Sequence, residues 1–190
     1  MPNHSFVKGG KGKLLKTQAR AATAFFVGIA LCISTVWAEA TDAGANPCVS
    51  RSAELGNSAF WANTAVAQYA DGDYQAAVTT VDACFGIWGS KAGQQQKKLH
   101  EEGAKCPRTG RVSARAKAKI HENYLMNDVS TALWAKARSQ HELGDIEQAK
   151  VSYGRCVYMA CGRAWDPKGW FWSPSQDCAT FARKLVKTES

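Results

Sequence analysis

Two stretches decide the fold: residues 68–77 read QYADGDYQAA, and residues 140–149 read QHELGDIEQA. They lie 72 residues apart and share a glutamine, a Gly-Asp pair and an alanine in one register. The same offset, without a gap, also aligns serines, alanines and cysteines: Ser58 with Ser130, Ala65 with Ala137, Ala92 with Ala164, Cys84 with Cys156 and Cys106 with Cys178. A turn, small residues and two cysteines that recur together predict a duplicated helical hairpin.

The first hairpin is readable from its apolar spacing. A helix over residues 58–70 is predicted because Trp61, Ala65 and Tyr69 recur at four-residue intervals on one face. Gly72 is expected to take a left-handed turn, and Asp73 to cap the next helix. We expect that second helix to be interrupted at Gly89-Ser90 and to resume as a polar piece over residues 94–102.

The second half predicts a similar order of elements. We expect helical character from Ala114 to Met126, a pause at Asn127-Asp128, and then a helix that Ser130 caps. The second Gly-Asp pair should break that helix. A partner helix should follow and end near Cys161, and a final helix should cover residues 176–186. The chain has no run of alternating β-branched residues. The predicted class is all-α.

The first 38 residues have the layout of a secretory signal peptide. Five basic residues and no acidic residue precede Ala21, an apolar stretch runs to Ala38, and small residues around Ala38 offer a cleavage site. The alternative is an uncleaved signal anchor, because eighteen mostly apolar residues are just long enough to span a bilayer. We expect residues 39–190 to be the mature domain, exported to the periplasm or secreted, with membrane contact only through the signal segment.

Removal of that segment changes the charge argument. All 16 acidic residues lie at or beyond Glu39, whereas five of the 24 basic residues lie before it, which leaves 19 basic residues and a net charge of +3. This value does not support nucleic-acid binding. Residues 91–119 hold nine Lys and Arg against Glu101 and Glu102. Such a patch is most often a solvated helix face, but it would favour an acidic partner.

Six of the seven cysteines lie in the mature chain: Cys48, Cys84, Cys106, Cys156, Cys161 and Cys178. An even number behind an export signal predicts an oxidising compartment and three disulfides, for which 15 connectivities exist. The equal spacing of 22 in the two copies favours Cys84–Cys106 and Cys156–Cys178. Cys48 and Cys161 would then form the third bond.

Around the Gly-Asp turns the sequence resembles a tetratricopeptide repeat. Trp61, Ala65, Gly72-Asp73-Tyr74 and Ala77 match the family pattern in the first copy, and Ala137, Gly144-Asp145, Ala149 and Tyr153 match it in the second. The copies depart from the family in three ways: their offset is 72 residues, residues 90–129 show no third repeat, and neither copy has the usual proline after its second helix. The resemblance implies a short solenoid of two degenerate units, at about 57–106 and 129–178, with a concave protein-binding groove.

A dense aromatic segment lies between Cys161 and Cys178. Trp165, Trp170, Phe171 and Trp172 fall within eight residues. Such rings could plug the open end of the core, stack on sugars or clamp a peptide. Asp166 and Asp177 lie nearby, and paired carboxylates are what glycoside hydrolysis requires, although sequence does not give their separation.

No residue set predicts catalysis, a cofactor or a metal site. The pairs His121-Glu122 and His141-Glu142 lack the second histidine that a zinc-protease helix needs one turn later. The favoured function is therefore a non-enzymatic interaction module of the bacterial envelope. Its groove would bind a protein or peptide near Gln68, Tyr69, Gln140 and His141. The alternative is a cell-wall or polysaccharide binder, or a glycosidase, that uses Trp165, Trp170 and Trp172.

Overall fold

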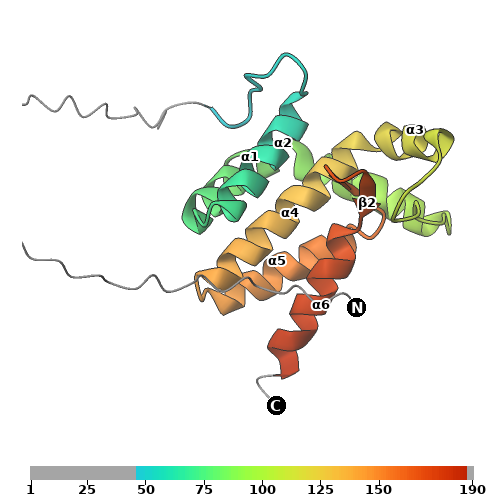
Figure 1. Ribbon diagram of the computed structural model, residues 1–190. Coiled ribbons are helices and arrows are strands. Elements are labelled where there is room, and N and C mark those ends of the chain that lie inside the picture. The colour runs from blue at the N-terminus through green and yellow to red at the C-terminus, as the bar shows by residue number, and fades with distance from the viewer. Residues whose placement is uncertain (1–45, 188–190) are drawn as a thin grey trace, which may run out of the picture. The chain divides into compact units, whose positions relative to one another are not determined.

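The computed structural model describes residues 46–187, and the signal-segment prediction lies outside them. The described chain contains six helices and a two-stranded antiparallel sheet (Figure 1). The elements are α1 (Asn57–Ala70), α2 (Tyr74–Glu101), α3 (Ala114–Glu122), α4 (Tyr124–Glu142), α5 (Ile146–Tyr158), β1 (Ala164–Asp166), β2 (Trp170–Trp172) and α6 (Pro174–Lys187). The predominantly helical, disulfide-containing architecture confirms the coarse prediction, with a small sheet in addition.

The two Gly-Asp turns have the same backbone geometry. Gly72 and Gly144 have φ values of 82° and 77°, a region that glycine enters without a steric penalty. In both turns the aspartate amide donates to the carbonyl of the glutamine five residues earlier, at 2.9 Å. These bonds close the first helix of each hairpin as a Schellman motif. The Asp73 side chain caps α2 by accepting from the Ala76 amide at 3.2 Å, whereas the Asp145 side chain forms no cap.

Helix α4 is the centre of the packing. It contacts α1, α2, α5 and α6, and Figure 1 shows it between the α1–α2 hairpin and the α5–α6 pair. The core that these helices enclose is made of small and aromatic side chains, with Trp61 and Tyr153 fully buried. The Trp61 indole nitrogen donates to the Thr80 carbonyl at 2.8 Å, which satisfies its one polar atom inside the core.

Three predicted boundaries were wrong. Helix α2 runs through Gly89-Ser90 without a break, the pause before α4 falls at Asn123 rather than at Asn127-Asp128, and Ser130 lies buried within α4 instead of capping it. Residues 164–172, in a chain predicted to be all-α, form the hairpin of β1 and β2. Asn127 and Asp128 lie within α4, where their side chains accept hydrogen bonds from the Arg163 amide and the Ser58 hydroxyl.

The three disulfides are Cys48–Cys84, Cys106–Cys161 and Cys156–Cys178. The pairing of Cys156 with Cys178 was predicted, but the predicted Cys84–Cys106 and Cys48–Cys161 bonds were wrong. Helix α2 continues 17 residues past Cys84, so its end lies about 25 Å away, and five further residues cannot return Cys106 to bonding distance. Helix α5 ends two residues after Cys156, which lets the hairpin bring Cys178 back.

Candidate functional site

An open groove of about 1350 Å³ is lined by residues of α1, α4 and the β1–β2 hairpin, with a few from α2 and α3. Helix α1 contributes mostly small side chains to it, and α2 adds Ile87, Trp88 and Lys91. The other walls carry the larger and more polar groups: His121, Tyr124, Leu125, Asn127, Asp128, Thr131 and Trp134 from α3 and α4, and Arg163, Trp165, Asp166, Phe171 and Trp172 from the hairpin segment. The first helices of the two hairpins and the tryptophan segment therefore border one site.

One face of α4 supplies polar and aromatic side chains to the groove, and we call this face the groove floor. Tyr124, Asp128, Thr131 and Trp134 follow one another at spacings of three and four residues, which places them on a single helix face. The ten residues from Tyr124 to Trp134 correspond to about 15 Å of helix. On α1, the lining exposes the small side chains of Ala67 and Ala70.

Asp128 is the half-buried acid of this floor. The Ser58 hydroxyl donates to its Oδ2 at 2.6 Å and links α1 to α4. Burial raises the pKa of the Asp128 carboxyl to about 6, and the hydrogen bond from Ser58 opposes that rise. Among residues 46–187, no cationic side chain forms an ion pair with it. At neutral pH the groove thus holds a carboxylate without a basic partner.

The hairpin contributes aromatic side chains to the groove lining. Gly169, with φ of 98°, turns the chain between β1 and β2, and Trp165 lies opposite Phe171 in the ladder. Phe171 is buried, and its ring centroid lies 4.8 Å from that of Trp165. Trp165 remains 45% exposed, with the Lys117 ammonium 4.3 Å from its ring centroid. The hairpin therefore combines a buried anchor with an accessible aromatic face.

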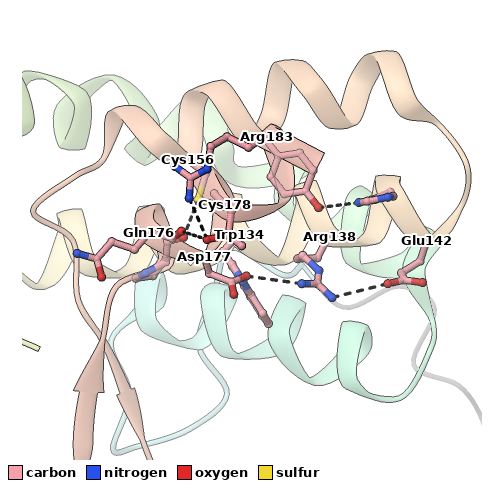
Figure 2. Close-up of polar contacts among 12 residues, drawn as sticks. Trp134, Arg138, Glu142, Cys156, Gln176, Asp177, Cys178 and Arg183 are labelled. Carbon is pink, nitrogen blue, oxygen red and sulfur yellow. Dashed lines mark hydrogen bonds and ion pairs between the residues drawn. A yellow bond between two sulfur atoms is a disulfide. The ribbon is translucent and has the colours of Figure 1, made fainter. Parts of the chain in front are cut away.

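Trp134 is held in place from the side of α6. Its indole nitrogen donates to Oδ2 of Asp177 at 2.7 Å, and Arg138 pairs with the same oxygen at 3.6 Å (Figure 2). The Trp134 ring also meets Tyr69 and Trp172 edge-on, with centroids 5.1 and 5.2 Å apart. Helix α6 thus fixes the orientation of an aromatic side chain that lines the groove on the other side of α4.

The four residues predicted to bind a partner do not line this groove. Gln140 is buried, and the Oε1 atoms of Gln68 and Gln140 have no hydrogen-bond partner. Tyr69 packs against Trp134, and burial raises the pKa of its hydroxyl. His141 lies 3.0 Å from the Tyr153 hydroxyl through its Nδ1. These side chains belong to the packing between α1, α4, α5 and α6.

The three tryptophans of the predicted aromatic platform separate. Trp165 and Trp172 line the groove, whereas Trp170, 37% exposed, does not. Asp166 also lines it, but Asp177 is engaged by Trp134 and Arg138. The two aspartates that sequence placed near each other therefore face different surroundings.

Sequence reasoning missed Asp128, Tyr124 and the groove position of Trp134. The three- and four-residue spacing on α4 was the available signal, but it became useful only once the helix was known to begin at Tyr124. The basic region 91–119 spans the end of α2, a linker and α3. Two of its lysines form exposed ion pairs one turn along α2, Lys97 with Glu101 and Lys98 with Glu102, and Lys91 reaches the groove.

Within residues 46–187, no group of three His, Cys, Asp or Glu side chains is arranged to hold a metal ion. No helix in that described range is both long and apolar enough to cross a membrane. The three disulfides are compatible with an extracellular or other oxidising compartment. Comparison with known proteins found no matching family model, no matching curated protein and no matching solved structure.

Proposed function

We propose that this chain is an exported, non-enzymatic interaction module that holds an extended segment of a partner protein in the groove along α1 and α4. The observation that carries the proposal is the groove itself, about 1350 Å³ in volume and lined by the first helix of each hairpin. An open channel with small residues on one wall and aromatic residues on the other suits a peptide backbone with intermittent side-chain anchors.

The proposed architecture is a short tetratricopeptide-like solenoid, with α1–α2 and α4–α5 as its two units. Its support is the repeated Schellman turn and the packing of α4 against both helices of the preceding hairpin. In this assignment α6 follows α5 as a closing helix, and the inner face of the stack is formed by α1 and α4. Stacked hairpins of this kind expose extended concave surfaces for partners.

The test is a pull-down with crosslinking from the envelope fraction of the source cells, using residues 39–190 in oxidised form. Ala67→Tyr would fill the groove from α1, and Ala83→Tyr makes the same change on an exposed position of α2 that does not line it. We expect one protein partner to be recovered with the wild type and the α2 variant and lost with Ala67→Tyr. Equal recovery with both variants would contradict binding in the groove.

A second candidate function is glycan binding, and the exposure of Trp165 favours it. Flat aromatic faces at the rim of an open groove can stack on sugar rings. The hairpin provides a matched pair of variants, because Trp165 lines the groove and the similarly exposed Trp170 does not. Retention on cell-wall polysaccharide that is lost in Trp165→Ala and kept in Trp170→Ala, without a protein partner, would establish this function in place of the first.

A further inference from the structure

The charged side chains that line the groove differ in whether they have partners within the chain. The acids on its lining are Glu54, Asp128 and Asp166, and the bases are Lys91 and Arg163, with His121 in addition. Arg163 is buried, and its guanidinium donates to the carbonyls of Pro107, Ala160 and Gly162. The side chain of Asp166 accepts from the Lys168 amide at 2.8 Å. Asp128 is the acid that lies on the groove floor with only a neutral hydroxyl bound to it.

Aromatic side chains share the lining of the groove with this acid. Tyr124, one turn before Asp128 on α4, is 62% exposed, and Trp88, Trp134 and Trp172 line the same channel. Aromatic faces attract cations through their quadrupoles, and a carboxylate among them adds a direct charge partner. An acidic ligand would instead meet the Asp128 carboxylate in a poorly hydrated site. The Asp128 carboxylate therefore favours a cation at its own position, although Lys91, Arg163 and Lys117 lie elsewhere along the groove and the region 91–119 is basic.

Resting on the proposed function, we propose that the groove binds a peptide carrying a lysine or arginine side chain, whose cation lies against Asp128 between the aromatic side chains of α4 and the hairpin. About 15 Å of groove accommodates four or five residues of extended chain, so one basic side chain would be flanked by backbone on both sides. The ligand class is a basic peptide segment rather than an acidic one.

A purely structural role would also be served by the Ser58–Asp128 bond that joins α1 to α4. An asparagine keeps an acceptor oxygen for Ser58 and removes the negative charge. Asp128→Asn therefore separates the two roles. The hydrogen bond from Ser58 would be kept in this variant, whereas recognition of a cation would be lost. Glu101→Gln removes one negative charge from an exposed position at the end of α2 and is the matched control.

The probes are blocked pentapeptides, Ala-Ala-X-Ala-Ala, in which X is Lys, Met or Glu. Binding to oxidised residues 39–190 is followed by the indole NMR signals of the tryptophans up to millimolar peptide. We expect the Lys peptide to bind more tightly than the Met peptide by about tenfold, as for a charge pair of about 1.4 kcal/mol. The Glu peptide should be the weakest. Asp128→Asn should remove the preference for Lys, and Glu101→Gln should keep it.

The pH dependence of the affinity for the Lys peptide is a second measurement. A purely structural role of the Ser58–Asp128 bond would not predict any such dependence. Affinity for the Lys peptide should fall between about pH 7.5 and pH 5 as the Asp128 carboxylate takes up a proton, and Asp128→Asn should remove most of that fall. Equal binding of the Lys and Met peptides, an unchanged preference in Asp128→Asn, or no binding of the Lys peptide would overturn the inference. The pull-down with Ala67→Tyr decides the proposed function independently of these results.

Discussion

At the residue scale, the Asp128 carboxyl has its pKa raised from 3.8 to about 6 by burial, so the folded chain binds this proton more tightly than the unfolded chain. The stability that the protonated form contributes is complete below about pH 4 and is lost as pH rises through 6. A shift of this size corresponds to about 3 kcal/mol at neutral pH. An ionised acid is therefore kept in the groove at a cost to the fold.

Asp128→Asn should consequently stabilise the protein at pH 7, by about 1–3 kcal/mol, because it keeps the acceptor for Ser58 and removes the buried charge. The gain should disappear near pH 4, where the wild-type carboxyl is protonated. Urea denaturation of both proteins across this pH range measures it. A destabilised variant at pH 7 would show that the charge is favourable in the fold and contradict the raised pKa.

Gly162 illustrates how closely the segment after α5 approaches α4. A Cβ at this position would lie 2.4 Å from Cβ of Ser130, which is buried on α4, and 3.3 Å from the Met126 carbonyl oxygen. Gly162→Ala should therefore lower the unfolding free energy by about 1–3 kcal/mol. Gly154→Ala is the control, since this exposed α5 residue has open space and should gain up to about 1 kcal/mol. Equal thermal stabilities of the two variants would contradict the close packing.

At the element scale, the helices on both sides of each Gly-Asp turn were predictable because their signals are local: four-residue apolar spacing before the turn and a glycine at positive φ within it. The length of α2 was not predictable from the sequence. Gly89 looks like a helix breaker in the sequence. In the structure, a Cβ at this position would lie only 2.6 Å from Cζ of the Phe85 ring. Glycine is there to admit an aromatic ring from the preceding turn, and a sequence pattern does not distinguish that role from a break.

Helix α6 supports the groove through its first turn. Asp177→Ala would remove the acceptor of the Trp134 indole and one partner of Arg138, so it should cost about 1–3 kcal/mol and loosen the Trp134 ring. Glu142→Ala removes the other, more exposed partner of Arg138 (Figure 2) and should cost less than about 0.5 kcal/mol. Denaturation curves of the two variants compare them directly. Similar losses would mean that the Trp134 bond contributes little.

At the scale of the whole molecule, the groove was beyond sequence reasoning because its walls come from segments far apart in the chain. Ser58 and Asp128 meet across 70 residues, and Trp165 joins them only because the chain after α5 folds back beside α4. The density of tryptophans drew attention to a segment of which Trp165 and Trp172 line the groove. The groove-lining side of α1 and α4 could not be predicted from the sequence, since it depends on the angle at which the two helices pack.

The disulfides enclose 36, 55 and 22 residues and tie the N-terminal arm to α2, the linker to the hairpin segment, and α5 to α6. Loops of these lengths stabilise by about 3–4 kcal/mol each in the chain-entropy model, or about 10 kcal/mol together. A domain of this size has a total stability of about 5–15 kcal/mol. Full reduction should therefore unfold most of the chain at 37 °C, whereas single pairs changed to serine should leave a folded but weakened domain.

Circular dichroism of the oxidised and reduced proteins, with the three paired Cys→Ser variants, measures this dependence. Cys156 and Cys178 are fully buried, so their replacement by serine also leaves two hydroxyls in the core and should be the most damaging change. The Cys48–Cys84 pair holds only the arm before α1, and its loss should be the mildest because the helices keep their mutual contacts. A reduced chain that still unfolds cooperatively within a few degrees of the oxidised one would mean that helix packing alone sustains the fold. The domain would then not need the oxidising compartment with which its bonds are compatible.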